Sequence, residues 1–188
     1  MDVSTIRRAR AKIRAKKVLS KFITLTLMCR LLGVIANKPV DLEFSLTHFR
    51  KFGEENPDGW GIGWYDEKGR AEVFKEPLPA SSEESKYLQY EKEVRSRIII
   101  AHVRRATTEG RSRENTHPFK HGNWIFAHNG SVDRDYILSL LSGRYKPEGR
   151  TDSEVYFYWI LHCINRKGDP MEGIKEEAAR VVEGAHGP

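Results

Sequence analysis

The stretch "SRIIIAHVRRAT" (residues 96–107) holds the strongest β-strand signal of this 188-residue chain. Its continuous run of β-branched residues is typical of a strand buried inside a sheet. We therefore predict a strand over 96–104 that runs into a pair of arginines, Arg104 and Arg105. Arginines at the end of a buried strand either face solvent or clamp a carboxylate with the planar guanidinium fork.

Upstream of this strand, hydrophobic periodicity predicts a strand, a helix, a β-hairpin and a second helix. The apolar run "CRLLGVIA" is ended by Asn37 and Pro39, and the hairpin turns at "DEKG". Serines before the second helix are suited to cap it. The elements are a strand over 29–36, a helix over 42–53 ending at Gly53, strands near 60–66 and 71–75, and a helix over 81–94 capped by Ser81 or Ser82.

Downstream lies a long polar loop over 105–122, and loops of this length are usually functional. A strand over 123–130 follows and runs into an Asn-Gly pair, and helices complete the chain. Strands and helices are segregated, which favours an α+β fold over a βαβ winding. The expected helices span 133–143, 151–168 with Thr151 as N-cap and Gly168 as its stop, and 170–184.

The composition fits a single soluble globular domain, with 39% hydrophobic and 31% charged residues. No apolar run approaches the roughly 20 residues of a membrane span, so no membrane association is expected. The two cysteines, Cys29 and Cys163, do not make a secreted disulfide framework, and a cytoplasmic location is expected. The histidines are scattered without metal-ligand spacing, so we expect no metal and no other cofactor.

The positive charge of the chain is confined to its first 27 residues. These residues include eight basic side chains and one acidic side chain, which leaves 24 basic and 25 acidic residues in the rest. No nucleic-acid partner is therefore expected of the main domain, which we place at 28–188. Residues 1–27 have three readings: an Arg-rich targeting segment, a basic tail that touches nucleic acid or membrane, or an upstream extension that is cleaved or is never made because translation starts at Met28.

Cys29 stands directly behind Met28, and this position changes how the cysteine is interpreted. A cysteine in an apolar strand is most often a small buried hydrophobe. If Met28 is the initiator and is removed, however, Cys29 carries the free α-amino group, with a reference pKa of about 7.7–8.0. That amine would serve as the base for the thiol of the same residue, as in N-terminal nucleophile enzymes.

Three further stretches each allow a structural and a chemical interpretation. "HNG" (128–130) suits a tight hairpin turn, or an oxyanion hole made by the Asn129 amide and the Gly130 backbone N–H. "TDSE" (151–154) suits a helix capping box, or a site in which Asp152 binds an ammonium group. "THPF" (116–119) could be a proline turn.

The order of these motifs is far more specific than any one of them. The chain resembles the class II glutamine amidotransferases, the N-terminal nucleophile glutaminase domains, and is most similar to the stand-alone branch that opens Met-Cys-Arg-x-Leu-Gly. The matching stretches are "MCRLLGV" (28–34), "NPDGWGIGWY" (56–65), "AHVRRAT" (101–107), "ENTHPF" (114–119), "AHNG" (127–130) and "TDSE" (151–154).

The resemblance implies a four-layer αββα sandwich of two antiparallel sheets, which we expect to be C-terminally incomplete because the chain ends at "EGAHGP". It implies that Cys29 attacks the γ-carboxamide of glutamine, with Asn129 and Gly130 as the oxyanion hole. Arg104 would hold the substrate α-carboxylate with Thr107 beside it, and Asp152 would bind the α-ammonium. His117 is expected to shape the pocket.

The motif "RRATTEG" departs from the wider class, because Arg105 and Thr108 replace a tryptophan and a histidine. This departure fits the stand-alone branch better than the synthetase-linked members.

Three points about function stay open. The substrate could be a γ-glutamyl peptide or amide instead of glutamine. Released ammonia could pass to a separate synthase. The domain would be catalytically silent if residues 1–27 stay attached, because the α-amine would then be blocked.

Overall fold

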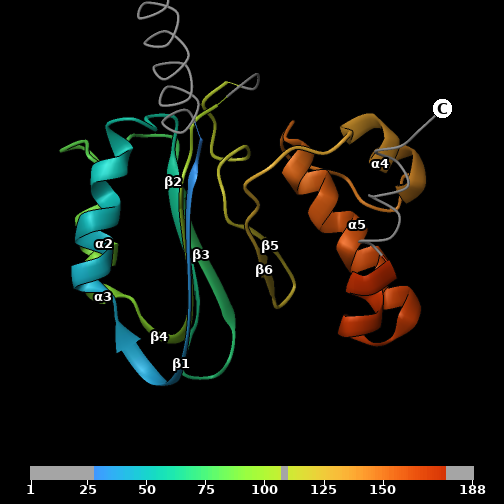
Figure 1. Ribbon diagram of the computed structural model, residues 1–188, viewed down its shortest axis with the longest axis horizontal. Helices are drawn as coiled ribbons and strands as arrows, with labels where there is room; N and C mark the ends of the chain where they lie inside the picture. The colour runs from blue at the N-terminus through green and yellow to red at the C-terminus, as the bar shows by residue number, and fades with distance from the viewer. Residues whose placement is uncertain (1–27, 107–109, 177–188) are drawn as a thin grey trace, which may run out of the picture.

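The computed structural model describes residues 28–106 and 110–176 as four layers stacked in the order helix, sheet, sheet, helix (Figure 1). Helices α2 (Glu43–Arg50) and α3 (Tyr87–Glu93) form the first layer, and a four-stranded sheet forms the second. A two-stranded sheet and helices α4 (Arg134–Leu141) and α5 (Asp152–Lys167) form the other two. The arrangement confirms the predicted α+β class with two antiparallel sheets.

The larger sheet has the strand order β1-β4-β2-β3, and every pair in it is antiparallel. Its strands are β1 (Arg30–Asp41), β2 (Trp60–Tyr65), β3 (Ala71–Glu76) and β4 (Arg95–Val103). Strand β4, predicted over 96–104, is central, and its last residue, Val103, pairs with Arg30 of β1 and with Trp60 of β2. This register brings Cys29, just before β1, beside the two arginines that follow β4.

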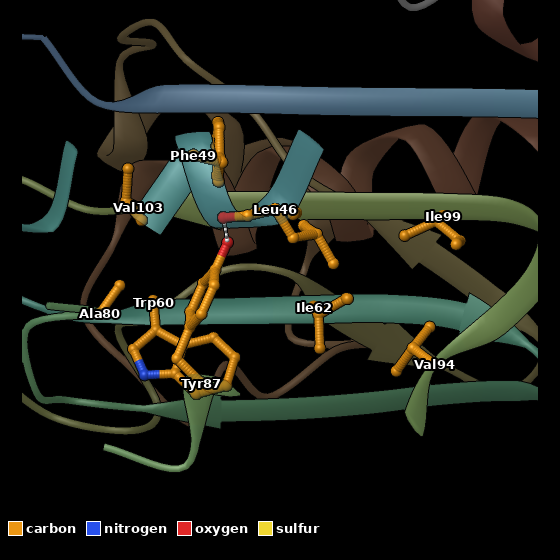
Figure 2. Close-up of a cluster of buried hydrophobic side chains, with 10 residues drawn as sticks. Leu46, Phe49, Trp60, Ile62, Ala80, Tyr87, Val94, Ile99 and Val103 are labelled. Atoms are coloured by element: carbon orange, nitrogen blue, oxygen red, sulfur yellow. Dashed lines mark hydrogen bonds between the residues drawn. The ribbon is translucent and has the colours of Figure 1, made fainter. Parts of the chain in front are cut away.

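The outer face of the larger sheet is covered by α2 and α3 through a hydrophobic core (Figure 2). Trp60 of β2 and Ile99 of β4 lie in this core with Leu46 of α2 and Tyr87 of α3. The Tyr87 hydroxyl donates a 2.9 Å hydrogen bond to the Leu46 backbone carbonyl, so its polar end is satisfied inside the core.

The inner face of β2 is flattened by glycines where the second sheet packs on it. A Cβ atom at Gly61 would overlap the backbone carbonyl oxygen of His117, and one at Gly63 would lie 2.8 Å from Ile125 Cγ2. The two sheets therefore approach each other closely because β2 presents no side chains at these positions.

The second sheet is the hairpin of β5 (Phe119–His121) and β6 (Trp124–Phe126). Its turn is anchored to the larger sheet, because the Asn123 carbonyl accepts from the Tyr65 hydroxyl at 3.0 Å and Asn123 Oδ1 accepts from the Ala71 N–H at 2.7 Å. The predicted strand over 123–130 is shorter than expected. The hairpin interpretation of Asn129-Gly130 is wrong, because the chain turns at Gly122 and Asn123 instead.

Helices α4 and α5 pack on each other through Ile137, Leu141, Val155, Trp159 and Cys163. The predicted limits of α5 are confirmed at both ends. The Thr151 hydroxyl accepts the N–H of Glu154 at 3.3 Å, and Gly168 follows the helix with a φ of 71°. The Glu154 carboxylate instead accepts backbone N–H groups of residues 148 and 149, so it does not complete a reciprocal capping box.

Three predicted element boundaries are corrected by long-range contacts. Strand β1 continues to Asp41, past a register shift between Ile35 and Val40. The predicted helix over 81–94 begins only at Tyr87, because the Glu76 carboxylate accepts the N–H of Lys86 and fixes a turn there. Helix α2 ends at Arg50 and is followed by the short 3-10 helix η1 (Lys51–Gly53).

The inner face of β1 and of the neighbouring part of β4 is not covered by the described residues. Leu31, Ile35 and Ile98 are 44%, 82% and 37% exposed, although Ile98 belongs to the strand predicted to be buried. The second sheet is too narrow to reach them. Residues 1–27 lie outside the described residues, and the predicted helix over 170–184 is described only to residue 176. None of the described helices is long and apolar enough to cross a membrane.

Candidate functional site

A cavity of about 450 Å³ lies where β1 begins, β4 ends and α5 begins. It brings together residues that are far apart in the sequence. Thr107, also predicted for the site, lies outside the described residues. The predicted residues that line the cavity are Cys29, Arg104, His117, Asn129, Gly130 and Asp152.

The thiol of Cys29 contacts the backbone of Arg105. The Arg105 N–H lies 3.2 Å from Sγ, and Sγ lies 3.4 Å from the Arg105 carbonyl oxygen. The β1–β4 pairing causes this contact, because Arg30 is opposite Val103 and the chain continues past both. These contacts hold the sulfur in place at the mouth of the loop that follows β4.

Asn129 and Gly130 lie in the loop between β6 and α4, next to the cysteine. The Asn129 side-chain amide donates to the Cys29 backbone carbonyl at 2.8 Å, and an amide nitrogen has a second hydrogen to donate. A Cβ atom at Gly130 would lie 2.7 Å from His128 Nε2, so the imidazole packs directly against this glycine. His128 therefore fixes the backbone whose N–H was predicted to stabilise an oxyanion.

Asp152 is the first residue of α5, and both of its carboxylate oxygens are held. Oδ2 accepts the N–H of Val132 at 2.9 Å, and Oδ1 accepts the N–H of Ser153 at 2.7 Å. His128 Nδ1 lies 3.1 Å from the Ser153 hydroxyl, which lies 3.3 Å from Oδ1 of Asp152. The Ser153 hydroxyl has one proton. If it donates that proton to Asp152, its oxygen is free to accept a hydrogen bond from Nδ1–H of His128.

Arg104 is only 4% exposed and is fixed at the end of β4. Its backbone N–H donates to the Gly59 carbonyl at 2.7 Å, and Nη1 donates to the Gly110 carbonyl at 3.3 Å. The nearby Asp58 carboxylate accepts hydrogen bonds from the Ala106 N–H at 2.8 Å and from Arg111 Nε at 2.7 Å. Partial burial raises the pKa of Asp58, but these hydrogen bonds outweigh it and lower the pKa below its ordinary value.

His117 lines the cavity, and His102 of β4 stacks behind it with ring centroids 4.3 Å apart. Burial, with the positive charge of Arg104 as a smaller cause, lowers the pKa of His102 to about 3. Burial also lowers the pKa of His117 well below its ordinary value. Both rings are therefore neutral near pH 7, which suits His117 to shaping the pocket rather than transferring protons.

Sequence reasoning missed the supporting roles of Asp58, His102, His128 and Ser153. All four residues lie inside the quoted motifs, so the motifs could have pointed to them. Their partners come from other elements, however, and the sequence does not show those contacts. Among the described residues, no cluster of histidine, cysteine and acidic side chains could hold a metal ion.

Comparison with known proteins identifies the family. The family model described as "Glutamine amidotransferases class-II" matches residues 28–186. "Putative glutamine amidotransferase YafJ" of Escherichia coli is 39% identical over 147 residues, covering 74% of this chain and 56% of that protein. "Gamma-glutamyl-hercynylcysteine sulfoxide hydrolase" of Mycobacterium tuberculosis is 39% identical over 125 residues, covering 65% and 51%. The chain thus spans about half the length of these relatives.

Solved structures agree on the fold. A glutamine aminotransferase class-II domain protein from Silicibacter pomeroyi has a TM-score of 0.59 at 25% identity, covering 85% of this chain and 67% of that one. Glutamine phosphoribosylpyrophosphate amidotransferase from B. subtilis has a TM-score of 0.58 at 21% identity, covering 80% and 32%. The motif order, the two-sheet fold and the family match agree, and the chain belongs to the class II glutamine amidotransferases.

Proposed function

We propose that the chain hydrolyses the γ-amide of glutamine to glutamate and ammonia, with Cys29 as the nucleophile. One observation carries the proposal: the thiol of Cys29 shares a single cavity with two oxyanion donors, an arginine and a carboxylate. A free α-amino acid requires one cation and one anion at fixed positions, and Arg104 and Asp152 supply them.

The reaction proceeds through a thioester. The α-amino group of Cys29 takes the proton of the thiol, and the sulfur attacks the carbonyl carbon of the glutamine side-chain amide. Negative charge develops on the amide oxygen, to which Asn129 and Gly130 donate hydrogen bonds. The C–N bond then breaks, and the protonated amine returns its proton to the departing ammonia. Water attacks the γ-glutamyl thioester next, which releases glutamate and restores the thiol.

Recognition of the glutamyl half uses the groups at the ends of β4 and α5. The guanidinium of Arg104 holds the α-carboxylate, and Thr107 lies in the same motif. The carboxylate of Asp152 binds the α-ammonium, and its position at a helix N-terminus suits a negatively charged side chain. His117 completes the wall of the pocket as a neutral ring.

The proposed base exists only when Cys29 is the first residue of the chain. The active form therefore lacks residues 1–27 and Met28, because a peptide bond at the Cys29 nitrogen removes its basicity. If the extension stays attached, the domain becomes a silent binding module with the same pocket. Any use of the released ammonia would require a separate synthase.

A second candidate is hydrolysis of a γ-glutamyl peptide or amide at the same site. The name of the M. tuberculosis relative supports this activity, because its stated substrate is a γ-glutamyl compound. Both reactions recognise the same glutamyl half and form the same thioester, and they differ only in the amine that leaves.

The test is to compare a chain that starts at Cys29 with one that starts at Met1, after intact mass has established each N-terminus. Glutamate and ammonia released from glutamine are measured for both. We expect activity only when Cys29 is first. Full activity in a chain that retains Met1 would refute the α-amine as base. Inactivity of the Cys29 chain toward glutamine and toward γ-glutamyl amides would refute the proposed function.

A further inference from the structure

The cavity has more positive charge than the glutamyl half of a substrate requires. Arg104, Arg105 and Arg134 line it, and Asp152 is the carboxylate among its lining residues. The lining histidines do not add to this charge, because burial lowers the pKa of both and keeps them neutral near pH 7. Once Arg104 and Asp152 are matched to the α-carboxylate and α-ammonium, two guanidinium groups are left over.

Arg134, the first residue of α4, has an unsatisfied hydrogen-bond donor. Its Nε is buried and has no hydrogen-bond partner among the described residues. Among the described residues, Arg134 forms an ion pair with Asp135, whose carboxylate lies 3.7 Å from Nη1. The Asp135 side chain is 94% exposed, so water screens the pair strongly. A buried N–H without an acceptor is costly, and an oxygen-bearing ligand in the cavity would satisfy it.

Arg105 is held at the nucleophile by its own backbone. Its N–H contacts the Cys29 sulfur at 3.2 Å, and its Nη1 donates to the Glu55 backbone carbonyl at 2.8 Å. A carbonyl is a neutral acceptor, so the charge of Arg105 is not cancelled. This is also the position at which the sequence departs from the tryptophan of the wider class.

We propose that Arg105 and Arg134 form a subsite for an anionic leaving half, and that the preferred substrates are γ-glutamyl amino acids or peptides with a free carboxylate. The inference rests on the proposed function and names its substrate class. Glutamine has no net charge and leaves this subsite without a partner, whereas a γ-glutamyl amino acid places its second carboxylate in an electropositive cavity.

The chemistry is unchanged and balanced. The sulfur of Cys29 forms a bond to the carbonyl carbon of the γ-glutamyl amide, the C–N bond of the isopeptide breaks, and the departing amino acid receives the proton from the α-amine. Water then hydrolyses the thioester. The products are glutamate and one amino acid or peptide, with no oxidant or other co-reactant.

The decisive comparison uses γ-glutamylglycine and γ-glutamylglycinamide, which differ only in the leaving-group carboxylate. Both are assayed with the chain that begins at Cys29, alongside glutamine. We expect kcat/KM for γ-glutamylglycine to exceed that for the glycinamide by about tenfold or more at low salt. The ratio should fall as salt rises, because salt screens charges that are open to solvent.

Substitutions assign the effect to the two arginines. Arg134→Gln and Arg105→Gln should each bring the ratio of kcat/KM for γ-glutamylglycine to that for γ-glutamylglycinamide closer to one. The matched control is Arg97→Gln, which removes the same charge near the opposite end of β4 and should leave the ratio unchanged. Equal rates for the two γ-glutamyl compounds, or a ratio that neither cavity variant alters, would overturn the subsite while leaving glutamine hydrolysis intact. Failure to hydrolyse any of the three compounds would instead overturn the proposed function.

Discussion

The side-chain amide of Asn129 lies 2.8 Å from the backbone carbonyl oxygen of Cys29, although 100 residues separate them. Cys29 precedes β1 of the larger sheet, whereas Asn129 follows β6 of the smaller one. The distance between the proposed nucleophile and the proposed oxyanion donor is therefore set by how the two sheets pack. Any change that moves the sheets apart should weaken catalysis as well as stability.

Replacing the proposed nucleophile gives the most direct prediction. Cys29→Ala and Cys29→Ser should abolish glutaminase activity while folding and glutamate binding persist, because in the proposed mechanism the thiol forms the covalent intermediate. Glutamate release, circular dichroism and glutamate titration measure the three properties. Cys163→Ala removes the chain's other thiol from the α4–α5 core and should remain active. Retained activity in Cys29→Ala would refute the assignment.

The close approach of the two sheets predicts that Gly61→Ala is strongly destabilising. Its methyl group would overlap the His117 carbonyl and lie 2.9 Å from Pro118 Cδ, so the sheets must separate. We expect a loss of about 2 kcal/mol or more in the free energy of unfolding, measured with urea.

The matched control for that variant is Gly33→Ala on β1. No atom of the described residues lies within 4 Å of a Cβ built there, so its effect should stay within about 0.5 kcal/mol. Equal losses for both variants would contradict the role of Gly61 in sheet packing, because Gly33 has no such close contact.

The charge of Asp152 is predicted to hold the substrate α-ammonium. Asp152→Asn keeps the shape and one oxygen acceptor but removes the charge, so KM for glutamine should rise about tenfold to a hundredfold. The effect on kcat should be smaller, because the reacting amide is at the other end of the substrate. Asp41→Asn, at the far end of β1, is the control. An unchanged KM in Asp152→Asn would remove this residue from the binding site.

Sequence reasoning succeeded where structure is decided by neighbours along the chain. Thr151 and Gly168 limit α5 through hydrogen bonds and dihedral angles within a few residues, and both were predictable. It failed where a distant group decides the outcome. The start of α3 depends on Glu76, eleven residues before Tyr87, and the three-residue strand β5 exists only because β6 pairs with it.

The same division applies to the candidate site. Ordered motifs were enough to select residues such as Cys29, Arg104 and Asp152, because each residue type suits a particular chemical task. The motifs do not show what holds these residues in place. The partners of Cys29 at Arg105, and of His128 at Ser153, lie 76 and 25 residues away and depend on strand register and helix packing.

The buried His102 predicts a specific loss of stability in acid. An unfolded histidine titrates near 6.5, whereas burial lowers the pKa of His102 to about 3. Below about pH 6.5 the unfolded chain therefore binds a proton that the folded chain rejects, so stability falls as pH decreases toward 3. Above about pH 6.5 both forms are neutral and the residue contributes nothing to the pH dependence. Each buried neutral histidine adds to the slope of the unfolding free energy against pH, by an amount that approaches about 1.4 kcal/mol per pH unit.

Urea unfolding between pH 7 and pH 4 tests this prediction by comparing the protein with His102→Gln. Glutamine keeps polar atoms at the position but cannot take up a proton, so the variant should lose stability less steeply over this range. His117 adds a slope of the same sign, because burial lowers its pKa too. His48→Gln, on the exposed face of α2, should leave the slope at its original value. If the free energy of unfolding falls equally steeply with decreasing pH in the original protein and in His102→Gln, the prediction is contradicted. His102 would then not be the source of the additional pH dependence.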